Sequence, residues 1–173
     1  MTSDVLLREV READLPLFFE QQLNPEANVM AAFVAEDPTD RGAFMAHWAR
    51  ILGDERTTTL TIVVDGQVAG HIASFEHFGK PSVSYWLGRD YWGRGIATRA
   101  LAALLRRIPT RPLYARAVKD NRASLRVLEK CGFAIVGEDV GFANARGHAV
   151  EEFILILRAP ADGGEPGSQG TTG

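Results

Sequence analysis

A glycine-punctuated loop between two predicted elements is the part of the sequence best suited to hold an anion. Tyr85–Leu87 reads as the end of a strand, and helical periodicity begins at Ile96, with Gly93, Gly95 and the small Ala97 around that start. Glycines let a backbone approach a ligand closely. Unpaired N–H groups and the dipole at a helix start favour negative charge there. The stretch therefore predicts an anion site.

Two well-known nucleotide-binding patterns do not fit this loop. The G-x-x-x-x-G-K-[ST] spacing of a phosphate-binding P-loop is absent, and a dinucleotide fingerprint would need glycine where Thr98 stands. A tight strand-to-helix turn, with glycines for steric reasons alone, remains the other interpretation. Arg89, Arg94 and Arg99 add positive charge around the loop.

A second informative stretch runs from Asn121 to Phe133, after the next predicted strand. Asn121 can cap a helix start. Ser124 shares one helical face with apolar residues that include Val127 and Leu128, by i, i+3 and i+4 spacing. Ser124 is therefore either a small packing residue or a hydrogen-bonding group at the mouth of a site, and Asn121 is either a cap alone or a cap that also reaches a ligand.

The two stretches together resemble the GCN5-related N-acetyltransferase (GNAT) superfamily, and within it the ribosomal-protein N-terminal acetyltransferases (RimJ/RimL-like). The acetyl-CoA motif Q/R-x-x-G-x-G/A is matched by Trp92–Ala97, with Trp92 at the first position, a departure typical of that branch. The branch's N-x-x-S-x-x-V-L-E-K-x-G-F pattern is matched throughout Asn121–Phe133, and the order of elements is similar from Leu6 to Leu157.

This resemblance implies an N-acetyltransferase in which an amine attacks acetyl-CoA directly in a ternary complex. The pantetheine arm would pair with the strand ending at Leu87, which splays from the strand Leu113–Val118. Backbone N–H groups of the loop would hold the pyrophosphate, and Arg89 and Arg94 would meet the 3′-phosphate. The residues implied in cofactor binding are Trp86, Leu87, Arg89, Arg94, Gly95, Ile96, Ala97, Thr98, Asn121 and Ser124.

The resemblance also implies catalytic roles. Ser124 would donate a proton to the departing thiolate, and Asn121 would bind pantetheine or position a water. The third predicted strand, Ser82–Leu87, has no carboxylate where many relatives carry a base. Glu76, one strand earlier, could act through water, or it is a surface glutamate beside a turn.

The scarcity of bases bears on the acceptor. A lysine-type amine has a pKa near ~10.4 and an α-amine near ~7.7–8.0, so the α-amine needs less help to become neutral. A protein N-terminus is therefore favoured as acceptor. Polyamines, amino acids and aminoglycosides stay open.

Other side chains carry weaker signals. Four scattered histidines and one cysteine form no metal-ligand pattern, so no metal is expected. His71 and His77 fall on one strand face and Glu76 on the other. Cys131 sits at an apolar helix end without a base nearby, which argues against a nucleophile.

The elements that must position these residues predict a mixed α/β arrangement around one sheet, and the resemblance implies a single-domain GNAT fold over residues 1–158. It has a mixed, mostly antiparallel sheet of about seven strands flanked by four helices. Residues 25–37 read as a loop and 159–173 as a disordered Gly/Ser/Pro-rich tail. Residues 24–37 (with Asn28, Met30 and Phe33) and the hairpin near 141–146 are expected to build the acceptor pocket. The predicted strands are 5–10, 57–64, 67–78, 82–87, 113–118, 133–142 and 149–157, and the predicted helices are 14–23, about 39–52, 96–108 and 121–131.

Composition narrows the functional class. The 173 residues include 46% hydrophobic residues, enough for a core, and the single cysteine excludes an intrachain disulfide. The chain shows no leader and no apolar run of membrane-spanning length, so a cytoplasmic protein without a membrane partner is expected. Both a monomer and a homodimer are compatible with the sequence.

Charge is unevenly distributed. The net charge is −3, yet residues 89–130 carry 11 basic and 3 acidic residues between two acidic flanks. This pattern fits a small anion such as CoA better than nucleic acid, which is not expected as a partner. The alternative functions are an acyl-CoA sensor with little turnover and a nucleic-acid binder. The alternative interpretation of the basic segment is that its charges lie on solvated helix faces.

Overall fold

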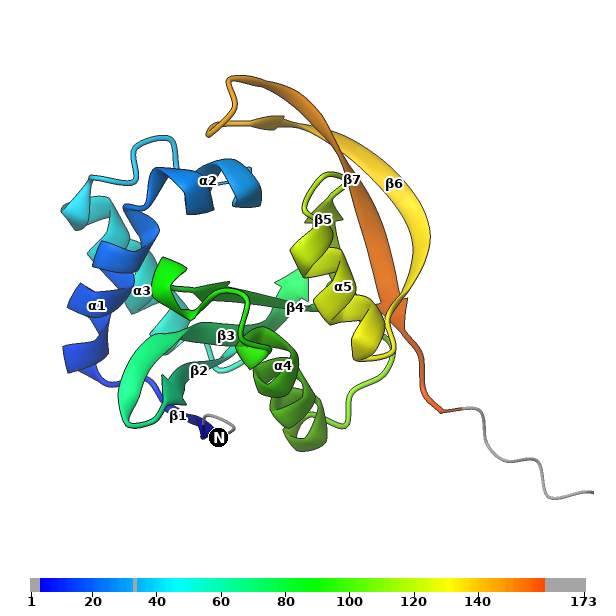
Figure 1. Ribbon diagram of the computed structural model, residues 1–173, viewed down its shortest axis with the longest axis horizontal. Coiled ribbons are helices and arrows are strands. Elements are labelled where there is room, and N and C mark those ends of the chain that lie inside the picture. Colours follow the sequence, from blue (N-terminus) through cyan, green and yellow to red (C-terminus); the bar gives the residue numbers. More distant parts are fainter. Residues whose placement is uncertain (1–3, 33, 161–173) are drawn as a thin grey trace, which may run out of the picture.

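One seven-stranded sheet organises the protein. The computed structural model describes residues 4–32 and 34–160, and its strands lie in the order β1-β2-β3-β4-β5-β7-β6 (Figure 1). All neighbouring pairs are antiparallel except β4 and β5. The predicted mixed, mostly antiparallel sheet is thus confirmed. The strands are β1 (Val5–Glu9), β2 (Thr58–Val64), β3 (Gln67–His77), β4 (Lys80–Leu87), β5 (Leu113–Val118), β6 (Ala134–Ala143) and β7 (His148–Leu157).

Helices cover both faces of this sheet. Helices α4 and α5 lie against one face, and α1 and α3 lie on the other side of β2–β4 (Figure 1). The two short 3₁₀ turns are η1 (Glu12–Asp14) and η2 (Arg89–Tyr91). The α-helices are α1 (Leu15–Gln22), α2 (Pro25–Ala31), α3 (Arg41–Gly53), α4 (Ile96–Arg107) and α5 (Arg122–Lys130).

The sheet opens between β4 and β5. The two strands run parallel and share a single paired position, Ser82 with Tyr114, near the start of each. Beyond it they diverge, so the end of β4 at Leu87 and the end of β5 at Val118 are not hydrogen-bonded to each other. The predicted splay is therefore present.

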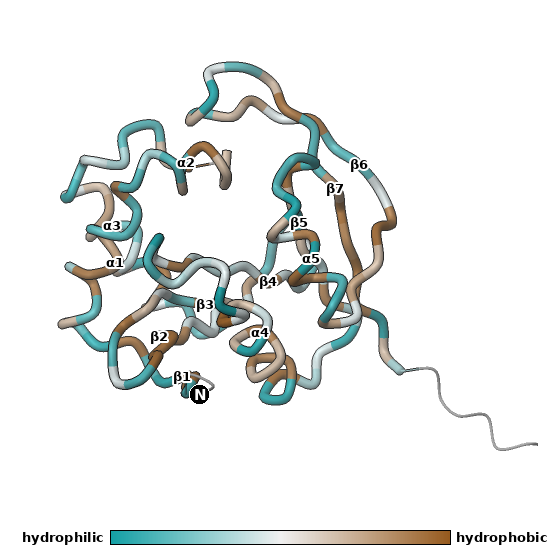
Figure 2. Tube along the Cα trace, viewed as in Figure 1, coloured by the Kyte–Doolittle hydropathy of each residue, from teal (hydrophilic) through white to brown (hydrophobic). Residues whose placement is uncertain are grey.

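Two of the three apolar clusters in the described residues fill the space between the sheet and helices α1, α3 and α4. On one face, Ile72 and Val83 of the sheet meet the inward side of α4, including Leu101 and Leu104. In Figure 2, β2 and β7 are largely brown, and brown and teal segments alternate along α4. On the other face, aromatic side chains of α1 and α3 form their own cluster. Its members are Leu15, Phe18, Phe19, Phe44 and Trp48.

The prediction that residues 25–37 form a loop is wrong for the first part of that range. Asn24 accepts a hydrogen bond from Ala27 N at 2.9 Å and caps α2, and Pro25 occupies the first helical turn. Proline is tolerated there because its missing N–H has no helical partner in any case. Asn24-Pro25 thus ends α1 and begins α2, which raises the α-helices in the described residues from the predicted four to five.

Gly70 is expected to be essential for the seam between β3 and β4. A Cβ there would lie 1.9 Å from the Trp86 carbonyl oxygen and 3.0 Å from Leu87 Cα, both backbone atoms. We expect Gly70→Ala to lower the free energy of unfolding by about 3 kcal/mol, because the two strands must part. Chemical denaturation measures the change. Gly53→Ala is the control, since a Cβ there meets nothing within 4 Å, and equal midpoints for the two variants would contradict the expectation.

Asp14 is a buried carboxylate that should make folding stability depend on pH. It is only 3% exposed and accepts hydrogen bonds from Arg8 Nη1 (2.7 Å), Arg11 N (2.9 Å) and Thr61 Oγ1 (2.7 Å). Burial acts to raise its pKa, but the hydrogen bonds, above all that from Arg8, outweigh it and lower the pKa to about 2. The unfolded chain binds the proton more tightly than the folded one.

Asp14 therefore contributes about 2 kcal/mol to the free energy of unfolding above about pH 4. This contribution is lost as the pH falls toward 2. Urea midpoints measured between pH 2 and 7 test this. In Asp14→Asn this acid-dependent loss should shrink, with lower stability at pH 7. An unchanged acid slope in that variant would contradict the assignment.

The predicted boundary at residue 158 stays a prediction. Most of the predicted tail, residues 161–173, lies outside the described residues. Among the residues that are described, no helix is both long enough and apolar enough to cross a bilayer.

Candidate functional site

A cavity of about 610 Å³ occupies the opening between β4 and β5. Its walls come from the glycine loop and the starts of α4 and α5 on one face of the sheet, and from α2, β5 and β7 on the other. The cavity therefore passes through the sheet and joins two halves. We call them the loop side and the α2 side.

The glycine loop forms the loop side. Gly93 and Gly95 have φ values of 71° and 72°, in the left-handed region that glycine adopts without strain. A Cβ at either position would meet no atom within 4 Å, so open space lies in front of the loop. Arg99 N donates to Gly95 O, so Ile96, Ala97 and Thr98 form the first turn of α4, where amides have no partner within the helix.

The positive charge lining the cavity differs from the sequence prediction. Arg89 and Arg94 are not among the lining residues, whereas Arg126 and Lys130 of α5 are. Arg89 Nε instead pairs with Glu26 Oε2 at 2.9 Å, and its guanidinium lies 4.7 Å from the centre of the Trp92 ring.

Arg94 likewise lies against an aromatic ring, that of Tyr91, at 5.7 Å. The i, i+4 spacing of Arg126 and Lys130, which places both on one side of α5, is the sequence signal that could have identified them. The cations that line the cavity thus come from the middle and end of α5 (Arg126, Lys130) and from Arg116 of β5, and none comes from the glycine loop.

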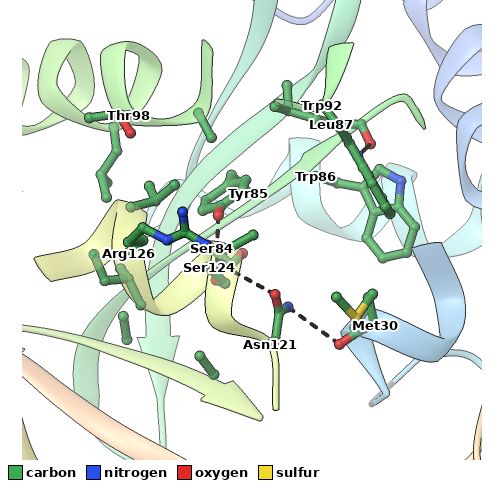
Figure 3. A pocket seen from close by; sticks show the side chains of 18 of the residues that line it. Met30, Ser84, Tyr85, Trp86, Leu87, Trp92, Thr98, Asn121, Ser124 and Arg126 are labelled. Atoms are coloured by element: carbon green, nitrogen blue, oxygen red, sulfur yellow. Dashed lines mark hydrogen bonds between the residues drawn. The ribbon is translucent and has the colours of Figure 1, made fainter. Parts of the chain in front are cut away.

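Ser124 lies between the two halves. Its Oγ accepts a hydrogen bond from the Tyr85 hydroxyl at 3.4 Å, and its N donates to Asn121 Oδ1 at 3.2 Å. In Figure 3, Ser124 and Tyr85 lie between Thr98 and Arg126 on one side and Met30 on the other. Ser124 is thus a hydrogen-bonding group of the cavity.

Asn121 both caps α5 and reaches across the cavity. Its Oδ1 takes the cap bond, and its Nδ2 donates to Met30 O of α2 at 3.3 Å (Figure 3). The amide therefore ties the start of α5 to the helix on the α2 side.

Tyr85 is a site residue that the sequence analysis did not assign. It belongs to β4, lines the cavity and is half-buried. Burial raises the pKa of its hydroxyl above the usual value, although the hydrogen bond with Ser124 acts in the opposite direction. The phenol therefore stays protonated near pH 7 and can donate to Ser124.

Helix α2 forms part of the α2 side, together with residues of β5 and β7. Met30 lines the cavity as expected, next to Ala27 and Ala31. Asn28, also expected there, is buried elsewhere and donates to Gln22 O at 2.8 Å. Phe33, the third residue expected in this pocket, lies outside the described residues.

The β6–β7 hairpin holds α2 in place. It arches toward α2 in Figure 1, and Arg146 Nε donates to Val29 O at 3.0 Å. The Arg146 guanidinium also pairs with Asp120, just before α5. These contacts place the hairpin beside α2, but none of residues 141–146 lines the cavity, so its part in an acceptor pocket stays a prediction.

Glu76 is not among the residues that line the cavity. It is exposed near the end of β3, opposite Pro81 of β4. Alternation along β3 places it on the face of Ile72, which packs toward α4. The structure therefore does not support Glu76 as the base, and it matches the alternative, a surface glutamate beside a turn.

Neither strand histidine reaches the cavity. His71 packs between Phe18 and Trp48, with ring centres at 4.8 and 4.9 Å. Burial lowers its pKa to about 4, so it is neutral at pH 7. His77 is exposed at the end of β3.

Cys131 has the environment of a structural thiol. Its Sγ donates to Thr98 O at 3.6 Å, and burial raises its pKa, which disfavours the reactive thiolate. Across the described part of the chain, no three His, Cys, Asp or Glu side chains gather as a metal site would need.

Taken together, the lining fits a ligand with phosphates at one end and a slender arm behind them. The open glycine loop, the first-turn amides of α4 and two cations can hold phosphate oxygens. The gap between β4 and β5 leaves the edge of β4 available to an amide-bearing arm, and Ser124 faces the middle of the cavity.

Comparison with solved structures shows the same fold in several acetyltransferases. RimJ of Mycobacterium smegmatis, in complex with CoA-disulfide, is 21% identical with a TM-score of 0.76, over 90% of this chain and 82% of that one. RimL, a ribosomal L7/L12 alpha-N-protein acetyltransferase in complex with coenzyme A, is 22% identical with a TM-score of 0.72, over 92% and 97%. Spermidine N-acetyltransferase from Vibrio cholerae, in complex with CoA and spermine, is 15% identical with a TM-score of 0.70, over 88% and 95%.

Sequence comparison identifies the family. No curated protein gives a significant match. The family model described as acetyltransferase (GNAT) domain matches residues 4–134, a range that contains both the glycine loop and the Asn121–Ser124 helix start. The chain therefore belongs to the GNAT acetyltransferase family.

Proposed function

We propose that this acetyl-CoA-dependent N-acetyltransferase acetylates an α-amine at the N-terminus of a protein or peptide. The observation that carries the proposal is the continuous cavity through the sheet, with Ser124 between a phosphate-binding half and a separate α2 side. A ternary complex needs room for two substrates, and the two halves of the cavity provide it. One accepts the acetyl donor, and the other admits the amine.

The loop side has the groups needed to hold acetyl-CoA. Amides of Gly95, Ala97 and Thr98 would bind pyrophosphate oxygens, with Arg126 and Lys130 near the remaining phosphate. The exposed edge of β4 at Trp86 and Leu87 would pair with the pantetheine amides. Acetyl-CoA, when bound, supplies an acetyl group activated as a thioester.

Ser124 is proposed as the proton donor to the leaving sulfur. Because its Oγ accepts from the protonated Tyr85 hydroxyl, its own hydrogen is free to point into the cavity. Asn121 fixes the backbone of Ser124 through the cap bond. The two neighbours thus orient the hydroxyl, which is the geometry that general acid catalysis requires.

An α-amine is the acceptor class that this site suits best. Its pKa near ~7.7–8.0 leaves a sizeable neutral fraction at pH 7.4, whereas a lysine-type amine near ~10.4 costs about 4 kcal/mol to deprotonate. The similarity to RimL, which is described as a ribosomal L7/L12 alpha-N-protein acetyltransferase, supports the same acceptor class.

A thiol-release assay over several amine classes tests the proposal. Purified protein and acetyl-CoA are mixed with unstructured hexapeptide amides bearing free α-amines, the same peptides with blocked N-termini, spermidine, free amino acids and an aminoglycoside. We expect CoA release with the free peptides and none with the blocked ones. Preferred turnover of spermidine, an amino acid or the aminoglycoside would overturn the acceptor class.

A second measurement separates turnover from binding alone. Calorimetry with CoA should show tight binding in the absence of any amine. CoA binding without acetylation of any amine in the panel would instead indicate an acyl-CoA sensor.

A further inference from the structure

Glu152 places a buried carboxylate on the wall of the cavity. It belongs to β7 and is 8% exposed. Among the described residues that line the cavity, it is the single Asp or Glu. Burial of a charged side chain in a strand is costly unless the charge is paired or used, so its position needs a reason.

The register of the sheet puts Glu152 on the α2 side. Glu152 pairs with Val118 of β5, and Arg116 lies two residues before Val118, so all three side chains share one face. The opposite face of β5 packs with α5 through Ala115 and Ala117. Glu152 is therefore separated from the phosphate-binding loop by the sheet itself.

Arg116 holds the carboxylate in place. Its Nη1 donates to Glu152 Oε1 at 2.7 Å and to Asp139 Oδ2 at 2.8 Å. Burial acts to lower the pKa of Arg116, but these two bonds raise it, so the guanidinium stays charged. One cation thus faces two carboxylates, and this part of the wall keeps a net negative charge. The bond from Arg116 uses only one oxygen of Glu152.

We propose that Glu152 receives the ammonium group of the acceptor and takes its first proton, directly or through one water. This rests on the proposed acetyl transfer. An N–H bond of the ammonium breaks as an O–H bond forms on Glu152, which then passes the proton to water. The neutral nitrogen forms the new N–C bond while the C–S bond breaks. Sulfur takes its proton from Ser124, and the second proton that nitrogen loses returns to Ser124 Oγ through solvent. The products are therefore an amide, a thiol and one released proton.

The charges around Glu152 also select the acceptor. A polyamine carries further ammonium groups, but no second carboxylate lines the cavity among the described residues. A free amino acid carries its own carboxylate, yet Arg116, the cation on this side of the lining, is already shared between two acids. The site therefore fits a single ammonium on an otherwise neutral chain, as at a peptide N-terminus.

Glu152→Gln tests the inference, with Glu151→Gln as matched control. Glu151 precedes it on the opposite strand face, is exposed and pairs with Lys119. We expect Glu152→Gln to reduce kcat/KM for a free-α-amine hexapeptide amide about 100-fold at pH 7. The deficit should shrink toward pH 9, where the amine is neutral without a base. Glu151→Gln should stay within twofold of the unmodified protein.

Binding supplies a readout that does not need turnover. In the dead-end complex with CoA, calorimetry should show about tenfold weaker binding of the same peptide to Glu152→Gln, with unchanged CoA affinity. In this variant Arg116 keeps its ion pair with Asp139, so the midpoint of thermal unfolding should change little. A pH-independent loss of activity, a weakened CoA complex, or unchanged peptide binding and turnover would each overturn the role of Glu152.

The two proposals fail in distinguishable ways. If the unmodified protein acetylates peptides and Glu152→Gln does so equally well, the inference on Glu152 is wrong and the proposed function stands. If the unmodified protein binds the peptide without turnover, the proposed function fails and the calorimetric comparison still decides on Glu152. Absence of both peptide binding and turnover overturns both.

Discussion

Ser124→Ala is expected to lower kcat by about 1000-fold while leaving the affinity for CoA within about threefold. As the C–S bond breaks, negative charge develops on sulfur inside a largely apolar cavity, and Ser124 is the hydroxyl that Tyr85 orients toward it. A positioned acid contributes 10²–10⁴-fold in such steps, on the order of 3–5 kcal/mol. Thiol release with the best acceptor gives kcat, and calorimetry gives the CoA affinity.

Ser74→Ala provides the control for this change. Ser74 lies on β3 opposite Val83 and does not line the cavity, so the same deletion of a hydroxyl should leave kcat unchanged. Tyr85→Phe should lower kcat by a smaller factor and add little to Ser124→Ala, because both act through one hydroxyl. If Ser124→Ala retains full kcat, the assignment of Ser124 as proton donor is wrong.

Gly95→Val is expected to weaken CoA binding by about 1000-fold. Gly95 caps α4 at φ 72°, a conformation that a β-branched residue strongly disfavours. The added atoms would also stand in the open space before the first-turn amides, where phosphate oxygens would bind. Losing two charge-assisted hydrogen bonds costs about 1.5–3 kcal/mol each, which gives this factor. Calorimetric titration with CoA measures it.

Gly66→Val separates backbone strain from the loss of the anion site. Gly66 lies in the turn between β2 and β3 with φ 82°, and a Cβ there also meets nothing within 4 Å. Both variants should lose folding stability, but Gly66→Val should bind CoA normally. Equal CoA affinities for the two variants would show that the loop does not hold the phosphates.

The features that could be predicted are those that neighbours in the chain determine. The glycine loop, the Asn121 cap and the helix that carries Ser124 follow from local backbone preferences and i, i+3, i+4 spacing. The strands were predicted from β-branched runs bounded by turn residues such as Asp65-Gly66, which are also local signals. Helix α2 was missed because Asn24-Pro25 reads as a stop, and only a short, weakly amphipathic segment follows it.

The site roles of side chains that meet across the sheet could not be predicted from local sequence patterns. Arg89 and Arg94 flank the loop in sequence, yet Arg89 pairs with Glu26 and neither lines the cavity. Glu76 is near β4 in sequence, but it is exposed near the end of β3 and does not line the cavity. The alternation of Glu152 with apolar residues of β7 was a visible signal, a carboxylate at an inward position. The proposed role of Glu152 depends on its contact with Arg116 and on its position on the α2 side, and both Arg116 and α2 are distant from it in sequence.

Sequence alone thus determined the family, the order of the strands, the glycine loop before α4 and the position of the Ser124 hydroxyl near the start of α5. These depend on interactions within a few residues, such as capping, positive φ and helical spacing. The tertiary structure decided which charges line the cavity, which carboxylate lies on the α2 side, and how Tyr85, Ser124 and Asn121 connect. Those choices depend on sheet register and on the single pairing between β4 and β5, which bring together residues far apart in sequence, such as Ser82 with Tyr114 and Val118 with Glu152.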